Sequence, residues 1–193
     1  MNYQLFHAIN QNAGHHPIID GAMVFFTQFA FPIFALVLIL MWILGKEKYK
    51  YTVVYAAVTA IIGLLINFVL GHIYNEPRPF VSHHVNVLVQ HVKDSSFPSD
   101  HATGTISIAL AVLWRKHRKI GFGMLLFAAL TGISRIYVGN HYPFDVLGSI
   151  VVSLVSSILV YKFVHVFEPI GRFVVSIYNR IPMVPKNEQN LSK

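Results

Sequence analysis

Two long stretches without a charged side chain constrain this sequence more than any other feature. No Asp, Glu, Lys or Arg occurs in residues 21–45 or 51–75. A helix needs about 20 apolar residues to cross the ~30 Å hydrocarbon core of a bilayer. Three shorter uncharged runs, residues 102–114, 120–134 and 146–161, are long enough when the polar residues beside them lie at the membrane interfaces. The pattern predicts an all-α, polytopic membrane helix bundle with about five transmembrane helices.

The rest of the composition agrees with one membrane-embedded unit. Only 12% of the residues are charged, whereas soluble domains carry about 25%. Residues 1–182 are expected to form a single membrane-embedded domain, followed by a polar cytoplasmic tail, residues 183–193. Residues 2–13 have an apolar face but are too few to span a bilayer, which predicts an N-terminal interfacial helix. Because the chain has no cysteine, it can form neither a disulfide nor a thiolate metal site.

Lys and Arg residues are concentrated at alternate ends of the predicted spans. They follow the first span (Lys46, Lys48, Lys50), the third (Arg115, Lys116, Arg118, Lys119) and the fifth (from Lys162 onward). The positive-inside rule places these ends and the C-terminus in the cytoplasm and the N-terminus outside. We therefore expect a multi-pass protein of the cell membrane. The net charge of +7 comes from these loops, so it indicates no nucleic-acid partner.

A polar segment between the last two predicted spans carries a cation, an imidazole and a carboxylate: Arg135, His141 and Asp145. Pro143 suits the first turn of a new helix, which places Asp145 inside that turn and His141 just before it. A carboxylate that accepts the proton of one imidazole nitrogen leaves the other nitrogen with a free lone pair, as a nucleophilic histidine requires. The alternative interpretation is a loop with a purely structural His–Asp contact.

Two further polar segments are predicted at the same outer face. Arg78 lies between two prolines that stiffen its backbone. Ser99 and His101 begin the third span, where a helix N-terminus offers free N–H groups to a phosphate. Two guanidiniums, Arg78 and Arg135, match the oxygens of a phosphoryl group. With one histidine to attack and another to protonate the leaving oxygen, the set favours phosphoryl transfer through a phosphohistidine, which needs no metal.

These residues resemble the three-part signature of the type-2 phosphatidic acid phosphatase superfamily, which reads Lys-x6-Arg-Pro, Pro-Ser-Gly-His and Ser-Arg-x5-His-x3-Asp. The matching parts here are Arg78-Pro79, then Pro98-Ser99-Asp100-His101, then Ser134-Arg135 with His141 and Asp145. Two positions depart from the pattern. Gly71 stands where the family has its lysine, and Asp100 stands where it has its glycine.

Within that superfamily, the chain resembles the undecaprenyl-diphosphate phosphatases linked to bacitracin resistance in bacilli. The resemblance implies hydrolysis of a polyprenyl diphosphate lipid, undecaprenyl diphosphate, to undecaprenyl phosphate and phosphate at the outer membrane face, with no cofactor and no metal. It also implies a role for each site residue: His141 as nucleophile, Asp145 as its orienter, His101 as general acid, and Arg78, Ser99 and Arg135 as phosphate ligands.

Three other residues are candidate modulators of the site: Asp100, Glu76 and His72. A carboxylate at Asp100 would lie near an anionic substrate, so it needs a partner; His101 and Arg78 are the candidates, or the side chain points into water. Asn67 is interpreted as a polar contact between two spans.

Other functions stay open at this point. One is a broader lipid phosphate phosphatase, acting on phosphatidic acid or phosphatidylglycerophosphate. Another is a metal-dependent membrane enzyme that uses the loop histidines His83, His84 and His91, although the lack of carboxylates or Cys at ligand spacing favours a solvated loop. The last is a non-enzymatic permease or bacitracin-binding subunit.

Overall fold

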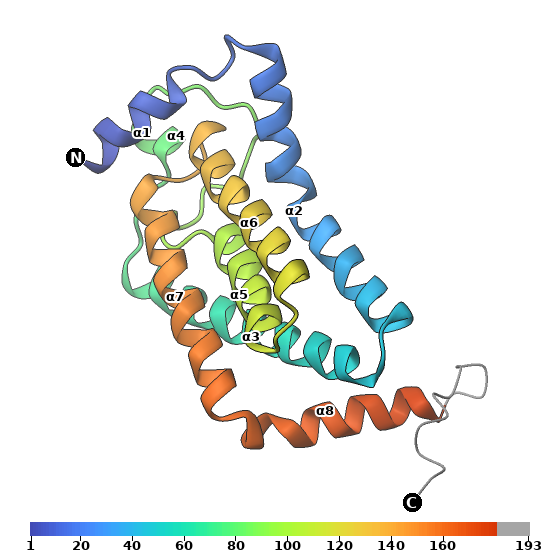
Figure 1. The fold of residues 1–193 in the computed structure, drawn as a ribbon. Coiled ribbons are helices and arrows are strands. Elements are labelled where there is room, and N and C mark those ends of the chain that lie inside the picture. Colours follow the sequence, from blue (N-terminus) through green and yellow to red (C-terminus); the bar gives the residue numbers. More distant parts are fainter. Residues whose placement is uncertain (181–193) are drawn as a thin grey trace, which may run out of the picture.

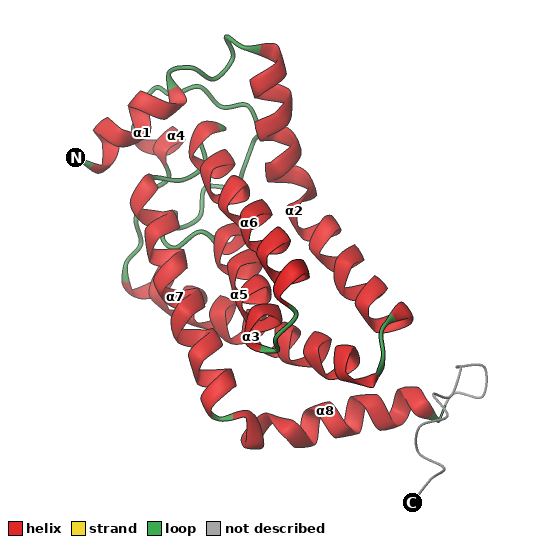
Figure 2. Ribbon diagram, viewed as in Figure 1, coloured by secondary structure: helices red, strands yellow, loops and turns green. Residues whose placement is uncertain are grey.

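The computed structural model describes residues 1–180, and this part of the chain contains eight α-helices (Figures 1 and 2). They are α1 (Asn2–Asn10), α2 (Pro17–Leu44), α3 (Glu47–Ile73), α4 (Pro79–Ser82), α5 (Asp100–Trp114), α6 (Arg118–Tyr137), α7 (Pro143–Lys162) and α8 (Val164–Asn179). The predicted all-α bundle is confirmed. The predicted tail, residues 183–193, lies outside the described residues.

Four of the described helices, α2, α3, α6 and α7, are long and apolar enough to cross a membrane. The third predicted span corresponds to α5, which has only 15 residues, or about 22 Å of helix. It lies at the centre of the bundle and packs against α3, α6 and α7 (Figure 1). Because other helices surround α5, it does not need the length or the apolar surface of a lipid-facing span.

Small polar side chains join α5 to α7. The hydroxyl of Ser149 donates to the carbonyl of Ser99 at 3.0 Å, and one turn further along the hydroxyl of Ser153 donates to the carbonyl of Thr103 at 3.0 Å. All four residues are fully buried. Small residues let helix backbones approach closely, and their hydroxyls satisfy polar groups that have no water to contact. This close packing fixes the start of α5 against the start of α7.

Two helices lie across the ends of the bundle (Figure 1). At one end, α1 is tied down by Asn10, whose amide donates to the carbonyls of Tyr137 at 2.9 Å and Asn86 at 2.7 Å. At the other end, α8 packs against the start of α3, where Gly171 lies against Tyr51. The short N-terminal helix predicted from the sequence is thus present, and it covers the junction between α6 and α7.

Candidate active site

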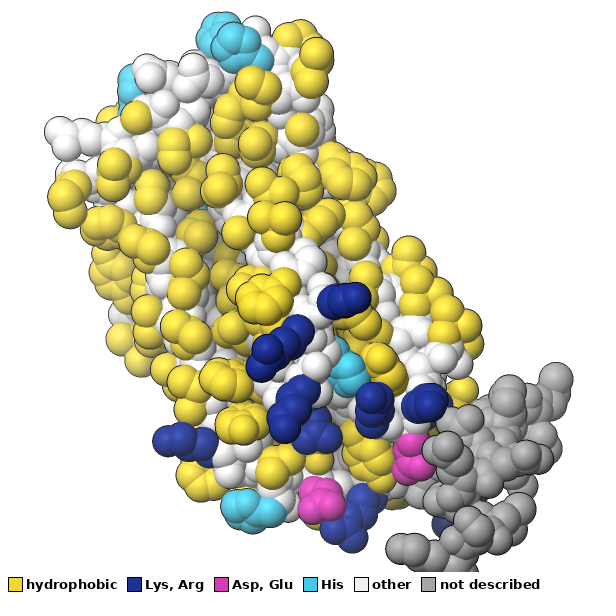
Figure 3. Space-filling model, viewed as in Figure 1, with side chains coloured by type: hydrophobic (Ala, Val, Ile, Leu, Met, Phe, Trp, Pro, Cys, Tyr) yellow, Lys and Arg dark blue, Asp and Glu magenta, His cyan; other side chains and the backbone are white. Residues whose placement is uncertain are grey.

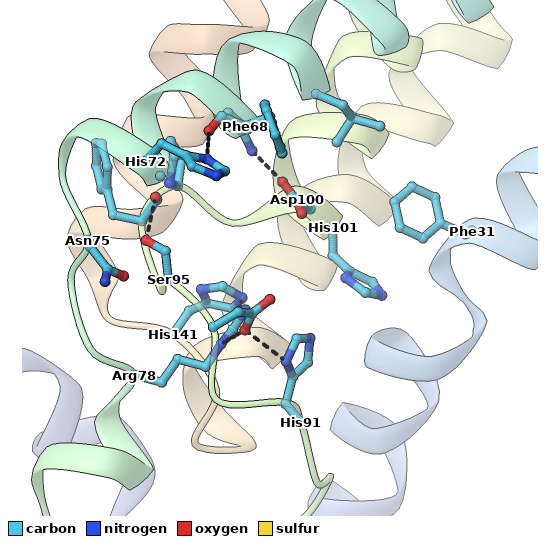
Figure 4. Close-up of a pocket in the computed structure, with 16 residues that line it drawn as sticks. Phe31, Phe68, His72, Asn75, Arg78, His91, Ser95, Asp100, His101 and His141 are labelled. Carbon is cyan, nitrogen blue, oxygen red and sulfur yellow. Dashed lines mark hydrogen bonds and ion pairs between the residues drawn. The ribbon is translucent and has the colours of Figure 1, made fainter.

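A cavity of about 820 Å³ opens at the end of the bundle near α1. Its walls come from Phe31 midway along α2, the C-terminal part of α3, the α3–α5 connection (residues 74–99), the start of α5, and His141 in the α6–α7 junction. Figure 4 shows Arg78, His91 and His141 together on one side, with His101 facing Phe31 on another. The three polar segments that the sequence placed at one membrane face therefore do converge in space.

The α6–α7 junction folds back on the last turn of α6. The amides of Asn140 and His141 both donate to the carbonyl of Arg135 at 3.1 Å. This reversal depends on Gly139, whose φ of +92° is strained for any residue with a side chain, and whose missing Cβ leaves room for the carbonyl of Asn86. The turn brings His141 back beside Arg135, and both side chains are 1% exposed.

The hydrogen bonds of His141 assign its tautomer. Nδ1 lies 2.8 Å from the carbonyl oxygen of Ser96. A carbonyl can only accept, so Nδ1 carries the proton. The lone pair is then on Nε2, which lies 3.0 Å from Nη1 of Arg78. Burial, followed by the positive charges of Arg135 and Arg78, holds the pKa of His141 well below its usual value. The imidazole is therefore neutral, with an available lone pair, as a nucleophile must be.

Asp145 holds His141 less directly than the sequence predicted. Its Oδ2 lies 3.4 Å from Nδ1 of His141, but the same oxygen accepts closer hydrogen bonds from the amide of Tyr142, at 2.8 Å, and from the hydroxyl of Ser96. Asp145 thus fixes the first turn of α7 and positions Ser96, whose carbonyl accepts the histidine proton. The sequence analysis missed Ser96, because its contact with Asp145 joins positions 49 residues apart.

Arg78 forms hydrogen bonds to three neighbouring residues through its Nε and Nη1. Its Nε donates to Asp94 at 2.7 Å, and its Nη1 lies 3.0 Å from both the carbonyl of Asn140 and Nε2 of His141. Partial burial acts to raise the pKa of Asp94, but the hydrogen bond and charge of Arg78 outweigh it, so the pKa is below its usual value. Asp94 lies in the same loop as His91 and anchors this arginine.

Arg135 has the opposite environment. Its Nε and Nη2 are buried and have no hydrogen-bond partner within residues 1–180. A buried cation without a partner is costly, so this arrangement favours the arrival of an anion. A bidentate guanidinium fits a phosphoryl group well, which supports Arg135 as a phosphate ligand.

The start of α5 lies at the wall of the cavity. The predicted ligand Ser99 is fully buried and is the N-cap, with its hydroxyl accepting from the amide of Ala102 at 3.5 Å. Its side chain therefore serves the helix rather than facing the cavity. His101 does line the cavity, and its ring lies 4.7 Å from the ring of Phe31 on α2.

The structure gives Asp100 a partner that the sequence analysis did not propose. Its Oδ1 accepts a hydrogen bond from the Asn67 amide at 2.8 Å, and that amide also lies 3.0 Å from the hydroxyl of Thr103. No hydrogen bond or ion pair joins Asp100 to His101 or Arg78 within the described chain. The expected pairing with one of those two was wrong, because Asn67 reaches Asp100 across the α3–α5 contact. Asn67 does join two helices, as predicted.

The other candidate modulators lie at the margin of the site. His72 lines the cavity, with its Nδ1 2.8 Å from the carbonyl of Phe68 in its own helix. Glu76 contributes its backbone carbonyl, which accepts from the Ser96 amide at 2.7 Å. Partial burial, and then the charge of Asp145, raise the pKa of the Glu76 carboxyl.

The loop histidines are dispersed. His91 lines the cavity with its ring centroid 6.4 Å from that of His141, whereas His83 packs on Tyr3 at 3.9 Å. Nowhere in residues 1–180 do three His, Asp or Glu side chains gather as metal ligands would. The described loop therefore has the geometry of neither a zinc site nor a related metal centre.

The cavity also has an apolar wall. It is formed by Phe31 on α2, Leu64 and Phe68 on α3, and Phe97 before α5. Charged and imidazole groups thus face apolar side chains across one space. A molecule with a phosphorylated head and a hydrocarbon tail matches both halves of this lining.

Comparisons with known proteins agree with this site. A family profile described as the PAP2 superfamily matches residues 52–168. The chain therefore belongs to the PAP2 superfamily and is a membrane phosphatase of that class. It is 45% identical over 181 residues to undecaprenyl-diphosphatase BcrC of Bacillus subtilis (strain 168), covering 94% of this chain and 93% of that protein. It is 28% identical over 200 residues to a bacitracin transport permease protein, BcrC of Bacillus licheniformis, covering 98% and 95%.

Two solved structures have the same fold. The crystal structure of Aquifex aeolicus LpxE aligns with a TM-score of 0.68 and 30% identity, covering 83% of this chain and 94% of that one. A PAP2-type phosphatidylglycerolphosphate phosphatase from Bacillus subtilis aligns with a TM-score of 0.63 and 24% identity, covering 84% and 86%. At 24% identity, the second comparison shows a shared fold and nothing more specific.

Proposed function

We propose that this protein hydrolyses undecaprenyl diphosphate to undecaprenyl phosphate and phosphate through a phosphohistidine on His141. The observation that carries the proposal is the pairing of a neutral His141, whose Nε2 holds the lone pair, with a buried Arg135 that has two nitrogens unpartnered within residues 1–180. The apolar wall of the cavity supports a lipid substrate. The similarity to a curated undecaprenyl-diphosphatase over nearly the whole chain supports the choice of that lipid.

In the first step, Nε2 of His141 attacks the terminal phosphorus, and the bond from that phosphorus to the bridging oxygen breaks. His101 gives its proton to the departing undecaprenyl phosphate. Arg135 and the free N–H groups at the start of α5 bind the oxygens of the transferred phosphoryl group. Nη1 of Arg78 lies 3.0 Å from the attacking nitrogen, so it must turn to a phosphate oxygen when substrate enters.

In the second step, a water molecule attacks the phosphohistidine. His101 takes a proton from that water, the nitrogen–phosphorus bond breaks, and phosphate leaves with Nε2 restored. Throughout both steps the proton stays on Nδ1, which donates to the carbonyl of Ser96, and Asp145 holds Ser96 in place through its hydroxyl. The buried imidazole therefore carries its developing positive charge next to a fixed acceptor.

The proposed reaction takes place at the outer membrane face, with the C-terminus in the cytoplasm, and it protects cells against bacitracin by recycling the lipid carrier. The Lys and Arg asymmetry supports this orientation. A cysteine at the exposed Ser82 should react with an impermeant thiol reagent in whole cells, and a cysteine at the exposed Lys119 should not. The reverse labelling pattern would contradict the orientation.

The direct test of the reaction is phosphate release from undecaprenyl diphosphate by the purified protein in detergent with a chelator present. We expect turnover to persist with chelator, because the proposed chemistry uses only side chains. Phosphatidic acid and phosphatidylglycerophosphate serve as competing substrates, and higher kcat/KM on either would favour the broader phosphatase. If the purified protein releases no phosphate, and the His141→Ala variant still protects cells from bacitracin, the protein is instead a binding subunit.

A further inference from the structure

A second groove, of about 690 Å³, lies at the opposite end of the bundle from the candidate active site. Its lining comes from the last turns of α2, the connection to α3, and the first turn of α6: Val37, Leu40, Met41, Leu44, Gly45, Lys46, Lys48, Tyr49 and Ile120. Figure 3 shows Lys and Arg side chains gathered at this end of the molecule, whereas the end near α1 shows none on the same face.

The floor of the groove is rigid. The turn between α2 and α3 is so tight that a Cβ at Gly45 would collide with the carbonyl of Met41 and the side chain of Tyr49. Tyr49 is held from below by the ring of His117, stacked at 4.2 Å, and Nε2 of His117 lies 3.0 Å from the hydroxyl of Thr52. Packing between the helices therefore fixes the residues that form this side of the groove.

The lysines at its mouth differ in their contacts. Lys50 is buried and donates to the carbonyl of Gly45 at 3.1 Å, so it closes the end of α2. Lys46 and Lys48 are exposed, and neither forms an ion pair within residues 1–180. Glu47 lies between them and is also exposed and without an ion pair in the described chain. Arg118 and Lys119 begin α6 just before Ile120, so positive charge dominates this end.

We infer that this groove binds an anionic phospholipid, with its headgroup phosphate at Lys46 and Lys48 and an acyl chain along Leu40 and Leu44. The charges match a phosphate, and lysines near a helix end reach the headgroup level while their stems cover apolar surface. Leu40 and Leu44 are 45% and 78% exposed, and they continue the lipid-facing surface of α2. An acyl chain can therefore enter the groove from the bilayer.

A phospholipid fits the groove better than free phosphate does. Most of the lining is aliphatic, and inorganic phosphate would leave it unused. The inference is independent of the proposed reaction, because the groove shares no residue with the cavity that contains His141. The lysines of the groove also lie at the end of the bundle opposite that cavity (Figure 1).

Native mass spectrometry of the purified full-length protein tests the site with two probes, dioleoylphosphatidylglycerol and dioleoylphosphatidylcholine. We expect the parent to retain the anionic lipid preferentially. The double variant Lys46→Gln/Lys48→Gln should bind it about tenfold more weakly, since each basic residue near the headgroups contributes appreciably to anionic-lipid affinity. The matched control is Lys162→Gln/Arg180→Gln, which removes two exposed charges from the same end outside the groove and should bind as the parent does.

A second variant, Leu40→Trp, tests the apolar half of the groove by filling it while keeping both lysines, and it too should weaken retention of the anionic lipid. Unchanged phosphatase activity in detergent would show that each variant is folded. The inference is wrong if the lysine variant binds as the parent does, if the control pair loses as much, or if phosphatidylcholine binds equally well. It is also wrong if millimolar inorganic phosphate displaces the lipid, because the site would then recognise phosphate alone.

Discussion

Two regions each bury an arginine beside His141, and the two guanidiniums differ in their hydrogen bonds. At the end of α6, beside the α6–α7 junction, Arg135 is 1% exposed, and two of its nitrogens have no partner within the described chain. In the α3–α5 connection, Arg78 is 4% exposed and is hydrogen-bonded to Asp94, Asn140 and His141. Arg135 is thus suited to bind an anion directly, whereas Arg78 holds the α3–α5 connection to His141 and must release Nη1 before that nitrogen can bind a phosphate. The hydrogen bonds of each guanidinium thus distinguish Arg78 from Arg135, although the sequence motif gives both the same role.

The same contrast extends to the neighbours of each arginine. The α6–α7 junction is held by backbone hydrogen bonds over a few residues, from Arg135 to His141. The α3–α5 connection is held by side chains that reach across the fold, such as Ser96 to Asp145. Substitutions at the junction should therefore remove groups that take part in the reaction, whereas substitutions in the connection should disturb the positions of those groups.

The largest effect is expected from His141→Ala, which removes the proposed nucleophile. Turnover should fall at least ~10³-fold, by analogy with the loss of other covalent nucleophiles. Circular dichroism and gel filtration should match the parent, because the side chain contributes only two hydrogen bonds. A residual rate within tenfold of the parent would show that the junction does not supply the nucleophile.

Arg135→Lys should come next, with kcat/KM reduced about 10²-fold. Lysine keeps the charge but loses the planar fork that binds two phosphate oxygens at once. The same change should weaken inhibition by vanadate, an analogue of the five-coordinate transition state. Equal kinetics for the lysine variant would mean that Arg135 supplies only a point charge.

Asp94→Asn should have a moderate effect, about tenfold on kcat, because it loosens Arg78 without removing it. The pKa of Asp94 is lower in the folded protein, so its carboxylate stabilises the fold above the unfolded value, about 4. That contribution is lost as pH falls through the folded value. The melting temperature of the variant should thus fall below that of the parent at neutral pH and approach it in acid. A difference that widens in acid would contradict this role.

Asp100→Asn should have the smallest effect, within about threefold on kcat/KM, because its partner is the neutral amide of Asn67. The alkaline limb of the pH–rate profile should stay in place, since Asp100 does not contact His101. A shift of that limb to lower pH would show that Asp100 does control the proton on His101, and it would restore the pairing expected from the sequence.

The two regions also differ in how well the sequence predicts them. The α6–α7 junction is predictable because Arg135, His141 and Asp145 lie within one short segment whose turn depends on local residues such as Gly139 and Pro143. The α3–α5 connection is not, since Arg78 meets Asp94 across 16 positions and Ser96 meets Asp145 across 49. No local periodicity encodes such contacts.

The helices follow the same rule. Uncharged runs predict the lipid-facing spans, because those spans must be apolar along their whole length. They also predict a full span at α5, which has only 15 residues, from Asp100 to Trp114. A helix covered by its neighbours can be short and can carry polar side chains. The partner of Asp100 was missed for the same reason: it belongs to a helix contact rather than to a motif.

The most direct test of the account is rapid-quench labelling of the purified protein with undecaprenyl diphosphate that is radiolabelled in its terminal phosphate. The account predicts transient label on His141, stable in alkali and released by acid, and no label on the His141→Ala variant. Product formation at the parent's rate with label on no residue, or on a residue other than His141, would contradict the central claim.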